Sequence, residues 1–477
     1  MKLAASELQS VISADEVAAV GGEVEFFAGY SANPFPERPA VFNWNFGDGS
    51  MATGETATHI FSTAGVFEVS LEMRVGNEVD KTSFEFFVFE KNILLLTDSR
   101  ANESKIEILA AAAREQNILL DTAWGVGESV GFFAGENALT TALQSKFETL
   151  RSTNLIILWA RGGDGMSALS GFVQKLNPPL DFSAKEIVVI SDASLDSLAR
   201  LARGSFATLA PREILLTRAD ALREIIFLDD PSAAADLLDQ QSVQFRIVDS
   251  GLEEFRLTAP LSFLVNYLVS EGIPASVILL VLLLPVIATL VAFLKQVVGI
   301  TTFGVYTPSV LTLSFLAIGW RLGIIVLLVV VFASILIRKM LHRYRLAYTP
   351  RLAIVLTFVS LSIFAAIVFA TYFRETDLIT ASIFPMLIMS TLAEKFVSIQ
   401  TEKGSRSAIQ MFGELLFVSL GCYFVVGEWS FLQTTLLAHP EIIFLFVLFN
   451  VVLGRFTGLR ITEHIRFREV IKKSEEE

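Results

Sequence analysis

Seven hydrophobic segments between Ala275 and Gly458 constrain this chain more than any other feature of its sequence. A helix needs about 20 apolar residues to cross a hydrocarbon core of about 30 Å, and each segment reaches or approaches that length. The segments are Ser276–Leu294, Phe303–Ile318, Leu322–Ile337, Leu352–Phe373, Leu378–Phe396, Ala408–Val426 and Ile442–Leu453. The second and seventh are short, so we expect them to tilt, to extend into Gly299–Thr302 and Arg455–Leu459, or to bend at a proline. Residues 275–459 are therefore predicted to form a seven-helix membrane bundle.

Charge divides the chain at the same place. Residues 1–274 hold 20 Lys and Arg against 38 Asp and Glu, a net charge of −18. Residues 275–477 hold 17 against 12, a net charge of +5, and the two parts sum to −13. The acidic front part is predicted to be soluble. It argues against nucleic acid as a partner, because phosphate binding needs a basic surface.

Basic residues mark alternate connections of the bundle, and Lys and Arg favour the cytoplasmic side of a membrane. They follow the first segment, lie between the third and fourth and around the fifth-to-sixth connection, and follow the seventh. They include Lys295, Arg338, Lys339, Arg351, Lys403, Arg406, Arg455, Arg460, Arg466 and Arg468. This alternation predicts that residues 1–274 are extracytoplasmic and that the C-terminus is cytoplasmic. Met1–Ser10 contains no apolar segment of a signal peptide, so we expect an export signal or an anchor helix upstream of this start. The alternative is an inverted topology, which would contradict all four basic connections.

Residues 1–90 show the alternation and turn residues of a β-sandwich. Val41–Ser50 reads Val-Phe-Asn-Trp-Asn-Phe-Gly-Asp-Gly-Ser, and His59–Phe61 and Gly65–Val69 follow it. This pattern resembles the PKD domain, an immunoglobulin-like sandwich, and the resemblance implies a spacer or a module that contacts protein or glycan. We expect Trp44 and Phe46 to point into the core. Asp48 is interpreted as a turn carboxylate that accepts nearby backbone N–H groups, with calcium binding as the less favoured alternative.

Residues 91–250 alternate short apolar runs with helix-length segments, which predicts an α/β domain with a parallel sheet covered on both faces. The predicted strands are Asn92–Thr97, Ile118–Asp121, Leu155–Ala160, Ile187–Ser191 and Ile225–Leu228, with Val243–Val248 as a further candidate. The predicted helices are Ser104–Glu115, Thr140–Leu150, Met166–Gln174 and Ser194–Ala202.

Ligands of such folds bind beyond the carboxyl ends of the strands, where this sequence places Asp98, Asp164 and Asp192. The domain contains no Gly-x-Gly-x-x-Gly motif and no phosphate-binding Walker lysine. We therefore expect no cofactor, no metal and no catalysis, and we favour binding of a peptide, a wall component or a partner protein. Residues 251–274 form a juxtamembrane connector, in which Ala259–Val269 is expected to lie as a helix along the outer surface, with polar residues on one face.

The membrane part carries several short motifs in a fixed order. They are Thr302–Pro308, Pro350–Leu352, Ile383–Met386, Ala393–Lys395, Glu402–Gly404, Gly454–Glu463 and Arg466–Arg468. They resemble the bacterial seven-helix membrane domain that is usually fused to an inactive transglutaminase-like domain. The resemblance implies the bacterial cytoplasmic membrane and a neighbourhood of ATP-grasp ligases and small aspartyl-type proteases. Transglutaminase chemistry needs a usable cysteine. The single cysteine, Cys422, lies in a helix and is interpreted as a packing residue.

Charged residues inside membrane helices are costly and therefore point to function. Glu394, Lys395 and Glu414 are predicted to form a polar cluster in the cytoplasmic third of the bundle, with snorkelling to the interface as an equally weighted alternative. Gly304, Pro308 and Pro385 are predicted to interrupt helices or to shape a re-entrant segment. Pro440 and Glu441 are interpreted as a helix start. Residues 460–477 form a basic amphipathic tail that contacts anionic lipid or a partner.

Two functions follow from these observations. In the first, the outer domains bind an envelope ligand or protein, and the helices recruit or inform a cytoplasmic partner, for which an ATP-grasp peptide ligase is the candidate. In the second, the chain is a transporter or flippase that uses Glu394 and Glu414. The membrane block lacks the Ser/His, His-Glu-x-x-His and paired-aspartate motifs that would favour an intramembrane enzyme.

Overall fold

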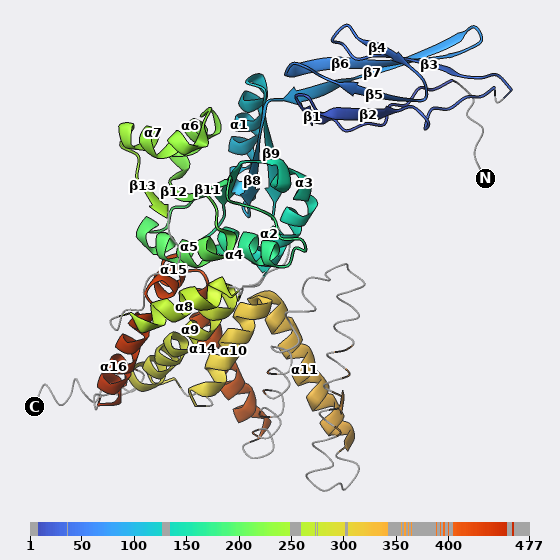
Figure 1. The fold of residues 1–477 in the computed structure, drawn as a ribbon. Helices are drawn as coiled ribbons and strands as arrows, with labels where there is room; N and C mark the ends of the chain where they lie inside the picture. The colour runs from blue at the N-terminus through green and yellow to red at the C-terminus, as the bar shows by residue number, and fades with distance from the viewer. Residues whose placement is uncertain are drawn as a thin grey trace, which may run out of the picture.

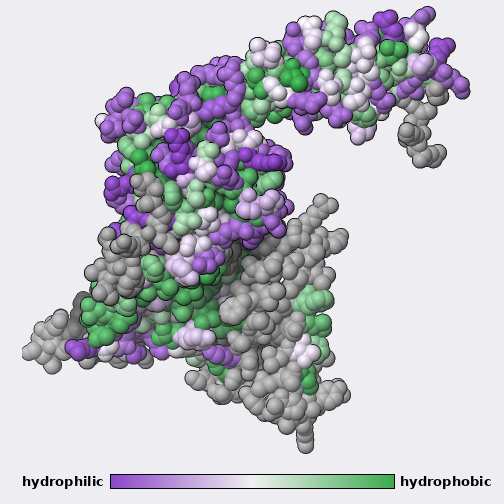
Figure 2. Space-filling view, viewed as in Figure 1, coloured by the Kyte–Doolittle hydropathy of each residue, from purple (hydrophilic) through white to green (hydrophobic). Residues whose placement is uncertain are grey.

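The computed structural model describes residues 8–35, 37–125, 134–248, 259–271, 273, 275–300, 304–341, 404–455 and 460–461, with isolated positions between 354 and 399. The described chain forms three parts in sequence order (Figure 1). A β-sandwich projects from an α/β domain, and the α/β domain rests on a block of apolar helices. Figure 2 shows the hydrophilic surface of the first two parts giving way to a hydrophobic surface on the helices.

The sandwich is built around a cluster of aromatic side chains. Its strands are β1 (Val17–Ala19), β2 (Glu23–Phe27), β3 (Val41–Asn45), β4 (Met51–Thr53), β5 (Thr56–Ile60), β6 (Gly65–Val75) and β7 (Glu78–Phe89). One sheet has the order β1-β7-β6-β3-β4, and β2 pairs with β5 in the other. Trp44 and Phe46 are each 1% exposed, and their rings lie 5.8 and 5.2 Å from that of Phe26. The predicted inward orientation of both residues is confirmed.

Asp48 closes the turn that follows β3. Its Oδ1 accepts a hydrogen bond from the backbone N–H of Ser50 at 2.9 Å, and its Oδ2 lies 2.7 Å from Nε2 of His59. Partial burial raises the pKa of Asp48, but the hydrogen bonds from Ser50 and His59 outweigh this and lower the pKa to about 2. The carboxylate thus has the predicted role of holding a turn.

The α/β domain contains a six-stranded sheet of order β13-β12-β11-β10-β8-β9. Its strands are β8 (Lys91–Thr97), β9 (Ile118–Trp124), β10 (Leu155–Trp159), β11 (Glu186–Ile190), β12 (Glu213–Thr217) and β13 (Phe245–Val248). Strands β8 to β12 run parallel to one another, and β13 pairs antiparallel with β12 at one edge of the sheet. Counted from β8, the parallel strands follow the doubly wound order 2-1-3-4-5, which has a topological switch point between β8 and β10.

Helices cover both faces of this sheet. They are α1 (Glu103–Glu115), α2 (Ala134–Ser145), α3 (Phe147–Ser152), α4 (Asp164–Gln174), α5 (Leu195–Leu209), α6 (Leu222–Ile226) and α7 (Ala234–Gln240). Leu94 and Leu96 pack with α2, α4 and α5, whereas Ile93 and Leu95 pack with α1, α6 and α7. Because neighbouring residues of β8 enter different cores, the strand is apolar throughout rather than alternating.

One predicted strand of this domain is wrong and one real strand was missed. The predicted strand Ile225–Leu228 lies partly in α6 and partly beyond its end, and the fifth parallel strand is β12. The two apolar runs are similar in length and both follow an Arg-Glu pair. Leu222, Ile225 and Ile226 are buried at the i, i+3, i+4 spacing of a helix, which is the signal that distinguishes them. α2 also begins six residues before the predicted helix start.

The apolar block contains the helices that follow the connector. They are α8 (Pro260–Ser270), α9 (Ala275–Phe293), the π-helical turn Leu294–Val298, α10 (Tyr306–Ile318), α11 (Trp320–Leu341), α14 (Ser405–Gly427), α15 (Ser430–Ala438), the 3₁₀ turn Pro440–Ile442 and α16 (Ile443–Gly454). Among the described residues, Ala275–Val298 and Arg406–Gly427 are each long and apolar enough to cross a membrane. The fourth and fifth predicted spans lie almost entirely outside the described residues.

The two short spans pair with neighbouring helices across sharp bends. α10 and α11 meet at 118° and α15 and α16 at 100°. Gly319 allows the first bend, since its φ of 86° suits glycine. The predicted extensions into Gly299–Thr302 and Arg455–Leu459 are not seen in the part that the structure describes, where α10 begins at Tyr306 and α16 ends at Gly454. Instead, the seventh span is preceded by α15, which the sequence analysis did not predict.

The layer formed by α2, α4 and α5 lies directly on the apolar block (Figure 1). Residues 165–170 of α4 are all buried, because the sheet covers one side of the helix and neighbouring helices cover the other. Leu158 in β10, Leu169 in α4, Val269 in α8, Leu283 in α9 and Val418 in α14 belong to one continuous hydrophobic core. The α/β domain and the helices therefore share a core instead of being joined by a linker alone.

Candidate functional site

The topological switch point of the sheet brings together side chains that follow two adjacent strands. Asp98 comes after β8, and Arg161 comes after β10. The Nε atom of Arg161 lies 3.1 Å from Oδ2 of Asp98, and the backbone N–H of Arg161 donates to the same oxygen at 3.2 Å. The Asp98 side chain is 4% exposed in this pair. Its charge is thus neutralised at the place where such folds bind ligands.

Asp164 lies three residues further on, at the start of α4. Loss of hydration on burial raises the pKa of its carboxyl group to about 7. The carboxylates of Glu136 and Asp98 raise the pKa further, and Arg161 opposes them. A helix N-terminus stabilises a carboxylate by only about 0.3–1 kcal/mol, so burial decides the direction of the shift. Asp164 is therefore a carboxyl group that changes its protonation state near neutral pH.

Glu136 joins this group from α2 and connects it to the membrane block. Its side chain is 9% exposed, and its Oε2 accepts a hydrogen bond from the hydroxyl of Ser276 at 2.6 Å. Ser276 is the second residue of α9. Desolvation raises the pKa of Glu136, although the bond from Ser276 and the charge of Lys175 act in the opposite direction. The acidic cluster of Asp98, Glu136 and Asp164 thus lies at the boundary between the α/β domain and the first membrane helix.

Two of the three predicted ligand-site residues meet in this cluster. Asp192 follows β11 and is exposed, and the ion pair and hydrogen bonds described above do not include it. Glu136 was missed because the predicted helix began at Thr140, which left it in a loop. Among the residues that the structure describes, no three His, Cys, Asp or Glu side chains are placed to hold a metal ion. The arrangement favours proton exchange and hydrogen bonding across the domain boundary.

Two further hydrogen bonds fix the α/β domain to the block, and one carboxylate holds two segments of the block together. The hydroxyl of Thr208 in α5 and the amide of Gln174 in α4 both donate to the carbonyl oxygen of Ser270, at 3.1 and 3.2 Å. The carboxylate of Glu441 accepts bonds from the backbone N–H and the hydroxyl of Ser262, both at 2.8 Å. Glu441, in the first turn of the segment that leads into α16, therefore also caps the first turn of α8.

The predicted juxtamembrane helix is α8, which packs on α5 of the α/β domain. Asn266 is buried against α5, where Gly204 allows the close approach of the two helices. Leu264 and Tyr267 are the exposed residues. The face of α8 that packs on α5 therefore combines the apolar side chains of Val265 and Val269 with Asn266.

The motif residues of the membrane part form a second group. The Nζ atom of Lys395 donates to the hydroxyl of Thr307 at 2.9 Å and lies 5.8 Å from the ring centroid of Tyr306. The carbonyl oxygen of Pro308 accepts from the hydroxyl of Ser419, the fifteenth residue of α14, at 3.2 Å. Since a helix rises about 1.5 Å per residue, α10 begins about 21 Å along α14. The contact of Lys395 therefore lies within the block and not at its end.

The remaining predictions for this region have mixed outcomes. Gly304 has a φ of 74°, so it lets the chain turn before α10. Pro308 lies in the first turn of α10, where proline is tolerated. That it interrupts a helix or shapes a re-entrant segment stays a prediction. Glu414 accepts a hydrogen bond from Gln410 at 3.5 Å.

Several predicted residues lie outside the part of the chain that the structure describes. They are Glu394, Pro385, Arg351, Arg466 and Arg468, together with the side chains of Arg338 and Lys339. Arg455 and Arg460 are exposed, and Cys422 is fully buried.

The raised pKa of Asp164 makes a prediction about pH. The folded chain binds a proton at Asp164 up to about pH 7, whereas an unfolded chain releases it near the ordinary pKa of 3.8. The contribution of this group to stability therefore falls as pH rises from about 4 to about 7 and is constant above that range. We expect the thermal midpoint of Asp164→Asn to rise relative to that of the wild type as pH increases from about 4 to about 7. The exposed control Asp192→Asn should follow the wild type. A difference between wild type and Asp164→Asn that is the same at every pH would contradict the prediction.

Two family models match the sequence. Residues 263–471 match a family described as seven transmembrane helices usually fused to an inactive transglutaminase, and residues 7–88 match the PKD domain. No curated protein matches the chain. Among solved structures, one described as "Structural basis for the promiscuous specificity of the carbohydrate-binding modules from the beta-sandwich super family" is 19% identical, with a TM-score of 0.17. The match covers 17% of this chain and 34% of the other, so this chain spans about a third of that structure.

The matched ranges agree with the parts seen in the structure. The PKD match covers the sandwich strands up to Val88, and the membrane match begins within α8. The pairing of the two describes a membrane protein with an extracytoplasmic domain. Residues 263–471 are therefore a membrane domain of the seven-helix family usually fused to an inactive transglutaminase, and residues 7–88 are a PKD domain that precedes it in the chain.

Proposed function

We propose that this protein is a receptor or scaffold of the bacterial cytoplasmic membrane. Its PKD and α/β domains bind a ligand or protein of the envelope, and its helices recruit or inform a cytoplasmic partner. The C-terminus is on the cytoplasmic side. Lys295, Arg406 and Arg455 lie at helix ends away from the α/β domain, whereas Arg321 lies at the end next to it, and this distribution supports the orientation.

The observation that carries the proposal is the core shared by the α/β domain and the membrane helices. A transporter predicts outer domains that can be removed without loss of transport. Here, removal of the α/β domain would expose the apolar side chains of α8, α9 and α15 that α4 and α5 cover. A shared core also lets a change at the switch point reach α9 through Glu136 and Ser276. Both features favour a receptor or scaffold that transmits a signal, and they disfavour a transporter.

The cytoplasmic partner that we propose is an ATP-grasp peptide ligase, docked on the basic tail. Arg455, the residue after α16, and Arg460, the first residue of the tail, are both exposed. Exposed guanidinium groups bind carboxylates and phosphates in bidentate fashion, so they suit either an acidic protein surface or anionic lipid.

Affinity capture of the full chain from native membranes, followed by mass spectrometry, tests this proposal. We expect an ATP-grasp ligase to be captured with the wild type and to be reduced about tenfold or more when Arg460, Arg466 and Arg468 are changed to Ala, since each lost charge-assisted contact costs about 1.5–3 kcal/mol. Arg321→Ala is the matched control and should retain the ligase. Recovery of the same ligase from the triple variant, or no ligase with the wild type, would contradict the proposal.

A further inference from the structure

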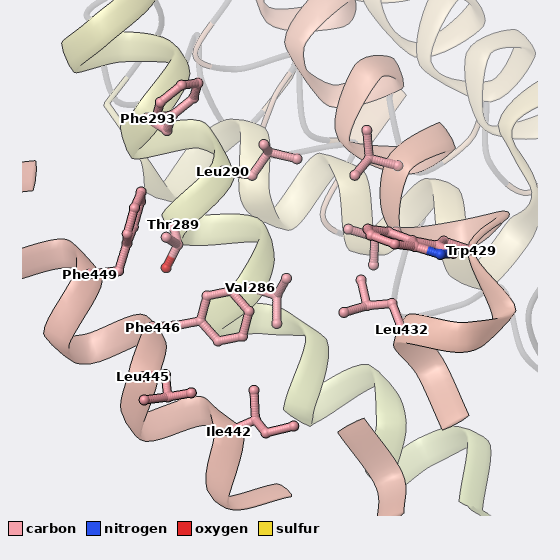
Figure 3. Close-up of a pocket in the computed structure, with 12 residues that line it drawn as sticks. Val286, Thr289, Leu290, Phe293, Trp429, Leu432, Ile442, Leu445, Phe446 and Phe449 are labelled. Atoms are coloured by element: carbon pink, nitrogen blue, oxygen red, sulfur yellow. The ribbon is translucent and has the colours of Figure 1, made fainter. Parts of the chain in front are cut away.

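A groove runs between α9, the end of α14, α15 and α16 (Figure 3). Its volume is about 560 Å³, which is within the range of about 300–1,000 Å³ for small-molecule sites. The close-up shows Thr289 of α9 on the side of Phe446 and Phe449 of α16, and Val286 and Leu290 of α9 on the side of Leu432 and Trp429. These segments are far apart in the sequence, and the bend between α15 and α16 holds them around the groove.

The lining of the groove is almost entirely apolar. Thr289 contributes the hydroxyl group on α9, but this hydroxyl already lies 2.7 Å from the carbonyl oxygen of Pro285 and 2.6 Å from Nδ2 of Asn450. A water molecule in such a space needs two to four polar partners, which these side chains do not offer. The groove is therefore suited to an apolar occupant.

The groove opens sideways into the surface that faces the bilayer. Leu445 and Phe449 line it and are nevertheless 63% and 46% exposed, because they lie at its rim. The outward side of α16 continues this rim with exposed apolar side chains such as Phe444 and Val447. Trp429 lies where α14 ends beside the α/β domain and is 54% exposed, a position typical of an aromatic residue at a membrane interface. The opening is therefore continuous with the surface that lipid chains cover.

We propose that the groove binds one hydrocarbon chain of a membrane lipid, which enters from the leaflet next to the α/β domain. A second helix is a poorer fit. A helix with its side chains is about 10–12 Å across, so the groove would hold little more than one turn of it. A flexible chain fills an irregular groove without that constraint. This assignment does not depend on the proposed receptor function, since it follows from the lining and the opening alone.

The lipid site is tested with the full chain reconstituted in vesicles of phosphatidylethanolamine and phosphatidylglycerol, and then studied by native mass spectrometry in detergent. We expect the wild type to retain one lipid molecule that Val286→Phe and Leu432→Phe lose. The retained fraction should fall about tenfold or more, because the added ring takes the volume of the chain. Val447→Phe makes the same change at an exposed position outside the groove and should retain the lipid.

A second measurement uses the wild type, so it does not depend on the folding of a variant. A phospholipid with a photoreactive group near the end of its acyl chain is added to the same vesicles. We expect label on the α9 peptide that contains Val286 and Thr289, which are 6% and 4% exposed and thus out of reach of bulk lipid. Label confined to the outward side chains of α16, or equal lipid retention in Val286→Phe and wild type, would overturn the proposal. A dimer that Val286→Phe dissociates would do so too, because it would assign the groove to a second copy.

Discussion

Gly204→Val is expected to loosen the α/β domain from the juxtamembrane helix α8. A Cβ atom at Gly204 would lie 3.0 Å from the side chain of Val269 and 3.1 Å from the carbonyl oxygen of Asn266, which is tighter than ordinary contact. α5 must then move away from α8, at a cost of about 1–3 kcal/mol for overpacking. The hydrogen bond from Thr208 to Ser270 lies one turn further along α5 and should lengthen. We expect faster hydrogen exchange in both helices.

Gly171→Val is the matched control for this substitution. Gly171 lies in the neighbouring helix α4, and a Cβ atom there would meet no heavy atom within 4 Å. Both changes place a β-branched residue in a helix, so only the contact with α8 differs between them. Hydrogen exchange of the full chain, read peptide by peptide, measures the effect. Equal exchange of α8 in the two variants would show that the close approach at Gly204 does not hold the domain in place.

Gly47→Ala is expected to destabilise the PKD domain more than Gly49→Ala in the same turn. Gly47 has a φ of 82°, and its Cβ would lie 2.8 Å from the carbonyl oxygen of Glu68 in β6. The backbone of β6 has little freedom to retreat, because it is hydrogen-bonded to β3 on one side and to β7 on the other. Backbone strain of about 1–3 kcal/mol and the steric clash therefore add together.

Gly49→Ala distinguishes the cost of backbone strain from the cost of the steric clash. Gly49 has a similar φ of 92°, but a Cβ atom there would lie in open space. It should lose about 1–3 kcal/mol from backbone strain alone, and Gly47→Ala should lose clearly more. Hydrogen exchange of β3 and β6 in the full chain, measured as a function of denaturant, gives both values. An equal loss in the two variants would mean that β6 yields to the added methyl group.

Local signals in the sequence were sufficient for the architecture of the three parts. The motif around Trp44 predicted the sandwich because alternation and glycine turns act over a few residues. The strands β8, β10 and β11 were predicted because a sheet covered on both faces needs continuous apolar runs. Such runs are ambiguous when they are short. Ile225–Leu228 was therefore mistaken for a strand and Glu213–Thr217 was passed over, since only the neighbours of a run decide between helix and strand.

The candidate site was only partly predictable. Asp98 and Asp164 were identified because each follows a strand, and the ends of parallel strands meet at one edge of a sheet. Glu136 was not identified, because its role depends on Ser276, which is 140 residues away in the sequence. The pairing of Lys395 with Thr307 likewise depends on the packing of two helices. The sequence marked both residues as parts of motifs but not as neighbours.

The membrane block, the acidic front part and the order of the domains could be predicted from the sequence. These properties depend on hydrophobicity and charge, which can be summed along the sequence without knowing the tertiary contacts. Three features are seen only in the folded chain: α4 and α5 lie on α8, α9 and α15, the acidic cluster faces α9, and a groove opens beside α16. Each of these features depends on which faces of different helices pack together. The apolar pattern of a single helix shows that one face is buried, but it does not identify the element that covers this face.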